Sequence, residues 1–564
     1  MQMNIIRDIE ISKNLKKDFR AVDNTVVDYH TAVYEQMRTF VEEFPTDNNL
    51  FLFTNPYQTS PLSIVIGVRT SFLSKISVVV HGKNGDGGNI THSYDDGSYH
   101  SLHIVALLGL YPNYNNNITV QLETEDQNVI STDFQAQTDP LPDNFPIIEV
   151  IETAQTARLN NDLYYCPMSN SYLYAVDYEG EVRWLINETN PNFPQHLDGG
   201  STLWLLENGH LLANYINHYA LVELSQEGRI HRVYNLNTYI HHDLIQDTDS
   251  NFLIQSQDDN TNYVFDTLLK VDSITEEVLK NIDFKDIFDP NERVIQPTEE
   301  HNGSLAYDWL HANSIDYHTA SNVYITSSRH QNAVIATDQD TNEVKWILGS
   351  HYDWSERFQA CLLTPVDSEG NVLYDFSNDE DIIRADHEFW QWAQHSARIF
   401  TNNEDEHIVE LFVFDNGCFR SYDENNWIYP NVNYSRVLLY EINTSNMTVQ
   451  LIWNFGQELG SSYYCGYVSN VQYIKETNTI YINYGGIIID METGYSLGVP
   501  GQDAKVPGVD YDALSTQHYT HIVEVDFATK EILYDCQMYI PNNVGGEQMT
   551  PIYKGLKADL YTSN

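Results

Sequence analysis

The sequence predicts an all-β protein in which a small β-sandwich domain, with an N-terminal helical segment, precedes a six-bladed β-propeller. Aromatic residues make up 12% of the 564 residues, including 39 tyrosines, and aromatic side chains favour strands. A strand–turn–strand pattern recurs in six copies along the chain. The chain is also too long for one ordinary core, so several domains or one large repeat fold are expected.

Each copy of the repeat has two short apolar strands around an acidic or polar turn. The first copy is SYLYAVDYEGEVRWLI (171–186), whose DYEG segment suits a tight hairpin. Further copies lie at residues 218–234, 267–282, 333–348, 436–453 and 521–536. Another pair of strands precedes most of them, at residues 201–215, 241–257, 311–328, 395–412 and 469–485. Units of four strands, repeated six times, are typical of a β-propeller, which we place at residues 146–564.

The residues before the repeat have a different pattern. Residues 1–48 contain the helically spaced stretch VDYHTAVYEQMRTFVEEF and are predicted as a helical segment. Residues 49–145 alternate strands and turns, which predicts the β-sandwich. The glycine-rich HGKNGDGGNI (81–90) lacks the G-K-[ST] end of a phosphate loop and is interpreted as a hairpin turn. The linker is DPLPDNFP (139–146).

The charge balance of the chain limits the kinds of molecule that it can bind. The chain has 80 acidic and 29 basic residues, a formal charge of −51. Such a chain repels phosphate backbones and anionic lipid, so we expect no nucleic-acid partner.

We also expect no transmembrane segment and no signal peptide, because long apolar runs are absent. The five cysteines lack a C-x-x-C pair, which argues against a zinc ribbon or a thioredoxin-like motif, and a homodimer is left open.

Three histidines occupy one position of the repeat. His242, His311 and His395 each open the first strand pair of consecutive units, and the other visible units have no histidine there. The first strands of propeller blades line a central channel, so these side chains are expected to converge. A lone histidine is more often a hydrogen-bonded core residue, and a shared position can reflect common ancestry of the blades. The absence of histidine from the other units favours a functional site.

Two kinds of site suit three histidines. Three imidazoles can hold zinc, so a metal-dependent hydrolase or lyase is the alternative function. Arg329, at the far end of the strand pair that His311 begins, disfavours a cation unless an anion lies between them. Without a metal, the histidines, Arg329 and Asn313 make a pocket of donors that suits a sulfate or phosphate ester. We therefore expect neither a metal nor a cofactor.

Several motifs, in matching order, resemble those of the bacterial arylsulfate sulfotransferases. They are DWLHANSI, SSRHQNAVI, KWILG, WAQHSA, FDNG and YSR, with NPYQTSPLSIVI, VVVHGK and ALLGLYP in the front segment. The resemblance covers most of the chain beyond about residue 54. It implies a propeller behind a β-sandwich, an aryl sulfate donor, a phenol acceptor and no nucleotide sulfate donor. Transfer in this family runs by a ping-pong mechanism through a sulfohistidine.

The resemblance also implies roles for individual residues. The nucleophile falls on His395. The residues that hold the sulfuryl group fall on His311, Arg329, Asn313 and one of His241 and His242. We prefer His242, because its H-x-x-I spacing matches the family better.

Residues near these motifs have less specific interpretations. Trp392, just before His395, could stack on the aryl ring, although a place in the blade core suits it equally. Asp308 is interpreted as structural or supporting, and FDNG with Arg420 as a turn, with lining of the channel mouth as the minor alternative. The family implies a periplasmic or extracytoplasmic location. Residues 371–390 contain no cysteine where a family member has a disulfide loop, which weakens that implication.

Overall fold

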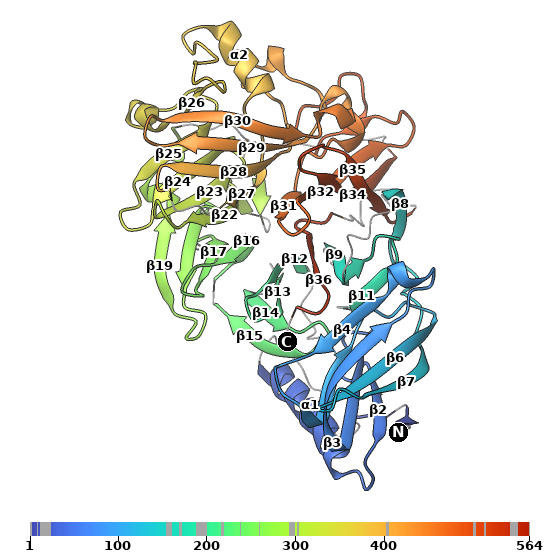
Figure 1. The fold of residues 1–564 in the computed structure, drawn as a ribbon. Helices are drawn as coiled ribbons and strands as arrows, with labels where there is room; N and C mark the ends of the chain where they lie inside the picture. Colours follow the sequence, from blue (N-terminus) through green and yellow to red (C-terminus); the bar gives the residue numbers. More distant parts are fainter. Residues whose placement is uncertain are drawn as a thin grey trace. The chain divides into compact units, whose positions relative to one another are not determined.

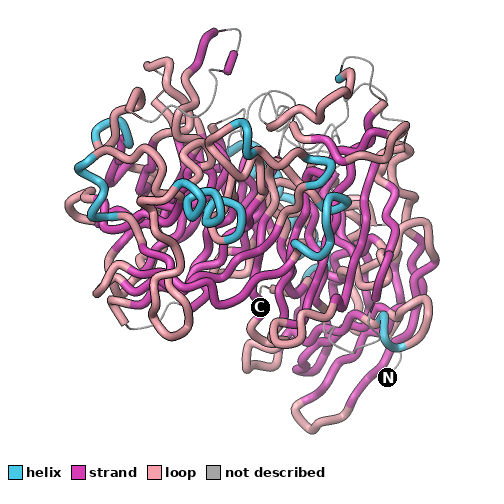
Figure 2. The backbone as a smooth tube through the Cα atoms, turned by 90° about the horizontal axis from the view of Figure 1, so that it is seen from above, coloured by secondary structure: helices cyan, strands magenta, loops and turns pink. Residues whose placement is uncertain are grey.

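The computed structural model describes most of the chain in two compact units. The first unit is Met1–Asn235 with Gly555–Asn564, and the second is Leu236–Lys554. Strands are the main secondary structure in both units, which confirms the all-β prediction (Figure 2). The described residues are 3–7, 9–11, 24–153, 161–168, 172–187, 200–215, 219–236, 238–258, 260–292, 299–301, 304–401, 405–499, 503–511, 515–541 and 551–562.

The predicted β-sandwich is built around one long strand, β3. The first half of β3 pairs with β2 and β5, and its second half pairs with β4 and β6. The segment HGKNGDGGNI joins β3 to β4, as expected for a hairpin connection. The strands are β1 (Asn4–Ile6), β2 (Asn49–Thr54), β3 (Ile64–Val80), β4 (Ile90–Tyr94), β5 (His100–Leu107), β6 (Asn115–Thr124) and β7 (Val129–Gln137).

The predicted N-terminal helix is α1 (Asn24–Glu43), whose buried face includes Val26, Val33 and Met37. Spacings of seven and four residues place these side chains on one side of the helix. Residues 12–23 of the predicted helical segment lie outside the described residues.

Two four-stranded antiparallel sheets complete the first unit. In one of them the C-terminal strand β36 pairs with β9, so the first repeat is closed by the end of the chain. Their strands are β9 (Asp162–Met168), β10 (Tyr172–Val176), β11 (Val182–Asn187) and β36 (Leu556–Asp559) in one sheet, and β12 (Gly200–Leu205), β13 (Leu211–Tyr215), β14 (Ala220–Leu224) and β15 (Ile230–Asn235) in the other. Strand β8 (Ile147–Thr153), which follows the linker, belongs to neither sheet.

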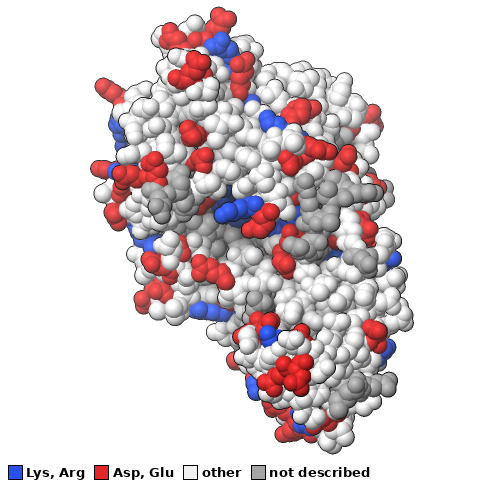
Figure 3. All heavy atoms as spheres, viewed as in Figure 1, with Lys and Arg blue, Asp and Glu red and all other residues white. Residues whose placement is uncertain are grey.

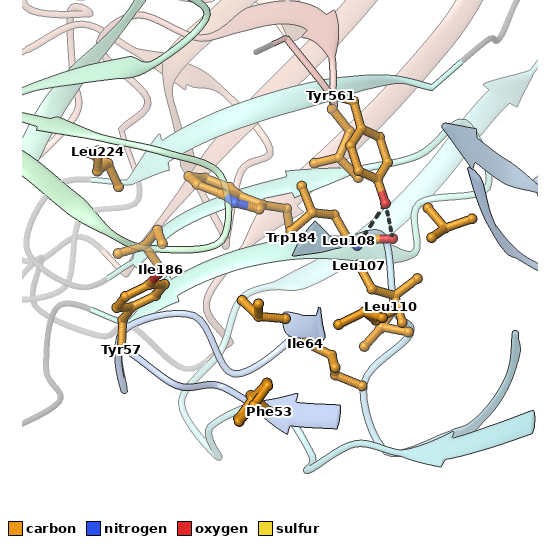
Figure 4. Packing of buried hydrophobic residues seen from close by; sticks show 14 of the residues in the cluster. Phe53, Tyr57, Ile64, Leu107, Leu108, Leu110, Trp184, Ile186, Leu224 and Tyr561 are labelled. Atoms are coloured by element: carbon orange, nitrogen blue, oxygen red, sulfur yellow. Dashed lines mark hydrogen bonds between the residues drawn. The ribbon is translucent and has the colours of Figure 1, made fainter. Parts of the chain in front are cut away.

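The core of the first unit joins the sandwich to these sheets. Figure 4 shows Phe53 and Ile64 of the sandwich with Trp184 of β11 and Tyr561, which follows β36. The backbone N–H of Leu108 donates to the Tyr561 hydroxyl over 2.8 Å (Figure 4). The C-terminal segment is therefore held by both pairing and packing.

Four more sheets of the same kind form the second unit. Each is an antiparallel meander of four strands, with β26 and β33 added at the sides of two of them. The strands are β16 (Ile240–Gln246), β17 (Phe252–Ser256), β18 (Thr267–Val271), β19 (Val278–Asp283), β22 (Ala312–His318), β23 (Val323–Ser328), β24 (Ala333–Asp338), β25 (Val344–Gly349), β26 (Thr364–Pro365), β27 (His395–Thr401), β28 (Ile408–Asp415), β29 (Arg436–Asn443), β30 (Thr448–Phe455), β31 (Asn470–Ile474), β32 (Thr479–Asp490), β33 (Ser496–Leu497), β34 (Thr516–Asp526) and β35 (Ile532–Tyr539). A short pair, β20 (Glu299–His301) with β21 (Ser304–Ala306), and helix α2 (Asp379–Glu388) lie between them in sequence.

The six sheets confirm the predicted six-bladed β-propeller. Every predicted hairpin is present, from β10–β11 for the first copy to β34–β35 for the last. The strand pairs expected before the hairpins are also present, as in β22–β23 and β27–β28. The alternation of apolar and polar residues around short turns was enough to locate them.

The inner strands β16, β22, β27 and β31 of the second unit lie side by side in this order (Figure 1). The register of β16, β22 and β27 shifts near their first residues, as at a β-bulge. Three non-glycine residues at these positions have a left-handed backbone conformation: His242 (φ 52°), His311 (φ 48°) and Ser396 (φ 54°). Such conformations are costly and collect at functional sites. The bulges thus coincide with the predicted histidines.

The surface charge, the cysteines and the helices relate to the remaining expectations from composition. Acidic side chains are spread over the face shown in Figure 3, with basic ones between them. All five cysteines lie in described segments, and none forms a disulfide. Among the described helices, none combines the length and the apolar character needed to cross a membrane.

Candidate active site

The second unit brings the three predicted histidines together. The ring centroids of His242 and His311 are 4.7 Å apart. The ring of Tyr553 lies 5.3 Å from that of His242 and 5.9 Å from that of His395. Burial is the main cause that lowers the pKa of each of these three histidines, and the Arg329 guanidinium is the next cause for His311 and His395. For His242 the neighbouring histidines act more strongly than Arg329, which also lowers its pKa. The arrangement is a compact cluster of imidazoles around one guanidinium.

Asn416 fixes the orientation of His395. The amide nitrogen of Asn416 donates to the carbonyl oxygens of Cys465 (2.8 Å) and Val468 (3.1 Å). Its oxygen therefore faces Nδ1 of His395, at 2.8 Å. An amide oxygen only accepts, so Nδ1 carries the hydrogen and Nε2 keeps its lone pair. Burial and the Arg329 guanidinium lower the pKa of His395 well below its ordinary value, which keeps this nitrogen unprotonated.

His241 fixes the orientation of His242 in a similar way. Nε2 of His241 lies 2.7 Å from the Ser256 carbonyl oxygen and must donate to it. Burial lowers the pKa of His241 to about 3, so this imidazole is neutral and its Nδ1 accepts. Nδ1 of His242, at 2.7 Å, is then the donor, and Nε2 of His242 keeps a lone pair. Of the two adjacent histidines, His242 is the one whose ring lies against His311.

His311 is held by a carboxylate. Oδ2 of Asp308 lies 2.5 Å from Nδ1 of His311. The carboxylate accepts the hydrogen of Nδ1, so Nε2 is again the nitrogen that remains for a ligand. All three histidines therefore use Nδ1 for a protein contact.

Arg329 is a buried charge that forms no ion pair with a carboxylate of the described residues. Its residue exposure is 1%. The guanidinium donates to Nε2 of His330 (2.8 Å) and to the Gly466 carbonyl oxygen (3.3 Å). Within the described segments, no carboxylate forms an ion pair with it. A buried cation is costly unless paired, so this geometry favours an anionic ligand.

The other predicted site residues have different surroundings. Asn313 donates through Nδ2 to the carbonyl oxygen of Gln394 (2.8 Å), the residue before His395. Trp392 is buried, donates from its indole nitrogen to the Asp386 carbonyl oxygen and lies 4.7 Å from the Tyr422 ring. Asn313 thus braces the His395 segment, and Trp392 packs against Tyr422. Their proposed contacts with substrate stay predictions.

A buried charge network joins the three histidine-bearing strands. Asp243, directly after His242, accepts from the Ile315 backbone N–H of β22 (3.0 Å). The same carboxylate pairs with Arg398 of β27 and with Lys554 (3.0 Å), next to Tyr553. Because Asp243 satisfies groups from several segments, it fixes the relative positions of the strands.

One group has the spacing of a metal site. Ligand atoms of Asp308, His311 and His330 lie within 4.8 Å of one another. However, Asp308 already accepts from His311, and His330 accepts from Arg329. Nδ1 of His330 also contacts the Asp308 carbonyl oxygen. These hydrogen bonds and the adjacent guanidinium occupy the group, so we assign no metal to it.

Sequence reasoning gave three neighbours of the histidines a minor role or none. Asp308 in DWLH is interpreted from sequence as structural or supporting, and Asn416 lies in the FDNG motif, interpreted as a turn with lining of the channel mouth as the minor alternative. Asp415 of FDNG forms an ion pair with Arg420 (2.8 Å), which agrees with a role of this motif in stabilising a turn. Tyr553 had no local signal, because only the fold brings the C-terminal segment to this site.

We expect Asn416→Leu to lower transfer strongly, because His395 can then hold its hydrogen on Nε2 and lose its lone pair there. A catalytic histidine held in the wrong tautomer loses up to about 10⁴-fold in rate. Asn116→Leu is the matched control, since Asn116 is equally buried and donates to the Tyr111 carbonyl oxygen (3.1 Å) within the β-sandwich of the first unit. Turnover and thermal unfolding would be measured for both variants. An equal loss of turnover in both would remove the tautomer role of Asn416.

Comparison with known proteins gives a consistent family. A family model described as Arylsulfotransferase (ASST) matches residues 149–547, and one described as Arylsulfotransferase Ig-like domain matches residues 51–139. A relative from Lelliottia amnigena, named arylsulfate sulfotransferase AssT, is 23% identical over 547 residues, covering 82% of this chain and 88% of the relative. A relative of the same name from Escherichia coli O6:H1 is 23% identical over 530 residues, covering 78% and 86%.

Proposed function

This chain belongs to the arylsulfotransferase family, and we propose that it moves a sulfuryl group from an aryl sulfate to a phenol in two steps, with His395 as the nucleophile. The observation that carries the proposal is the buried guanidinium of Arg329 among three histidines. Among the described residues this charge has no carboxylate partner. An anionic sulfate ester supplies the missing negative charge, and the relatives bear the name of enzymes that use such esters.

The first step is attack by His395 on sulfur. Its Nε2 carries a lone pair because Asn416 holds the hydrogen on Nδ1. Sulfuryl transfer resembles phosphoryl transfer in its loose, in-line transition state, so the protein mainly positions groups and stabilises the terminal oxygens. Arg329, held by His330 and Gly466, offers a planar fork of donors for two of these oxygens. The second step reverses the first, with a phenol as the attacking group.

Two aromatic rings, those of Tyr553 and Phe265, lie against the histidine cluster. Tyr553 and Phe265 lie 5.3 Å and 5.2 Å from the His242 ring. We propose that these rings contact the aryl group, because apolar faces and edges favour aromatic partners. Their position makes them stronger candidates than Trp392.

The alternative, a metal-dependent hydrolase or lyase, would use the same three imidazoles. Neutral histidines with free Nε2 atoms suit a metal as well as a sulfuryl group. Arg329 distinguishes the two, because a dication beside a buried guanidinium is repelled unless an anion separates them.

We expect wild-type protein to transfer sulfate from an aryl sulfate to a phenol without any nucleotide sulfate. Chelation with EDTA followed by dialysis should leave the rate unchanged, because no step in the proposed reaction uses a metal. Release of the donor phenol and formation of the new sulfate ester would both be followed. Loss of transfer on chelation, restored by zinc, would support the alternative instead.

Further features of the proposal come from the family resemblance and the composition. They are a periplasmic location, the absence of a nucleic-acid partner and domain boundaries near residues 48 and 145. These features, and the question of a homodimer, stay predictions.

A further inference from the structure

The Asp308–His311 contact differs in kind from the contact that holds His242. Asp308 is fully buried, and its Oδ2 lies 2.5 Å from Nδ1 of His311. His242 is instead held by His241, an imidazole that already donates to the Ser256 carbonyl oxygen. One histidine thus has an anion on its Nδ1 and the other has a neutral ring.

This difference decides which histidine can carry an additional proton. A carboxylate on one ring nitrogen stabilises the imidazolium that forms when the other nitrogen is protonated. A proton on Nε2 of His242 would have no anion on the opposite nitrogen, since Asp243 is engaged by Arg398 and Lys554. His311 is therefore the better proton carrier of the two.

We propose that Asp308 and His311 form the acid–base pair of this site, in which His311 passes one proton from the accepting phenol to the leaving phenol. Asp308 is then a positioning residue that makes His311, and not His242, the carrier. The inference rests on the proposed function and assigns a role within the same site.

The two half-reactions balance with one proton. In the first, the bond between sulfur and the aryl oxygen breaks and a bond from Nε2 of His395 to sulfur forms. The aryl oxygen keeps the electron pair of the broken bond and takes the proton from Nε2 of His311. In the second, the accepting phenol returns a proton to His311 as its oxygen attacks sulfur, and His395 recovers its lone pair.

The charged and titratable groups around His311 are compatible with this cycle. Burial and the Arg329 guanidinium lower the pKa of His311 well below its ordinary value in the empty site. The bound ester brings a negative charge that offsets Arg329, while Asp308 stays on Nδ1. His330 and His242, at ring distances of 4.6 and 4.7 Å, are neutral neighbours with lowered pKa values. Proton uptake by His311 thus accompanies binding of the donor.

The test compares two donors that differ in the basicity of the leaving oxygen. Phenyl sulfate needs a proton on its leaving oxygen, whereas 4-nitrophenyl sulfate releases a much weaker base. General acid catalysis typically contributes about 10²- to 10⁴-fold. We expect Asp308→Asn to lose about 100-fold or more with phenyl sulfate and at most about tenfold with 4-nitrophenyl sulfate.

His241→Asn is the matched control, because it changes the residue that holds Nδ1 of the other histidine. It should slow both donors by the same factor. Equal losses with both donors in Asp308→Asn would show that Asp308 is only structural and overturn the inference. A donor-dependent loss in His241→Asn and not in Asp308→Asn would assign the proton to His242 and also overturn it.

Two further measurements keep the outcome clear. If Asp308→Asn fails to fold, His311→Gln gives the same comparison, since glutamine can donate a hydrogen bond but cannot transfer a proton. Asp308→Asn treated with 4-nitrophenyl sulfate should still gain a sulfuryl group on His395. Absence of that adduct from wild-type protein would overturn the proposed function itself, whereas equal losses with the two donors overturn only the acid–base pair.

Discussion

We expect the largest effect from His395→Ala, which should abolish both transfer and the covalent intermediate. Nε2 of His395 is the nitrogen whose lone pair is secured by Asn416 and by a lowered pKa. Removal of a nucleophile in another two-step enzyme costs on the order of 10⁶-fold in turnover. A comparable loss is expected here, because the family resemblance assigns the nucleophile to His395 and we propose no second nucleophile in the site.

Mass spectrometry after brief exposure to an aryl sulfate measures the intermediate directly. Wild-type protein should gain about 80 Da on His395, with ping-pong kinetics and a burst of phenol when the second step is slow. His395→Ala should lose both the burst and the adduct. His311→Ala is the control, since it should slow both steps and still permit a slow adduct with 4-nitrophenyl sulfate. An adduct on His242 or His311 would contradict the nucleophile assignment, and kinetics that require both substrates bound together would contradict the covalent mechanism.

Arg329→Lys should lower turnover by about 100- to 1000-fold, the loss typical of one donor to a transition-state oxyanion. The planar guanidinium is held by His330 and Gly466 so that its remaining donors stay in one orientation. An ammonium is a point charge and cannot reproduce contacts with two oxygens. Turnover with 4-nitrophenyl sulfate as donor and phenol as acceptor is the measurement.

Arg329→Met separates the role in transfer from a role in folding. Because the guanidinium is buried and has no carboxylate partner among the described residues, its removal should leave the free energy of unfolding unchanged or raise it. Transfer should nevertheless be lost. Normal turnover in Arg329→Lys, or marked destabilisation with unchanged turnover in Arg329→Met, would remove Arg329 from the site.

The amino-acid sequence by itself determined the blades of this protein. Short apolar strands around polar turns, such as SYLYAVDYEGEVRWLI, are local signals, and they correspond to β10 and β11 as expected. The repeat also placed His242, His311 and His395 at the start of inner strands, since residues at one position of a repeat share one place in the blade. Arg329 was located by its place at the far end of the strand pair that His311 begins and by the family resemblance of its motif.

Only the tertiary structure decided how these residues can act. The hydrogen on Nδ1 of His395 depends on Asn416, and the orientation of that amide depends on the carbonyl groups of Cys465 and Val468. Likewise, the roles of the Asp308 carboxylate and of the Tyr553 ring depend on tertiary contacts that no local sequence pattern predicts. Strand periodicity is set by neighbours in the chain, whereas the tautomer and charge of a side chain are set by atoms that folding brings within hydrogen-bond distance.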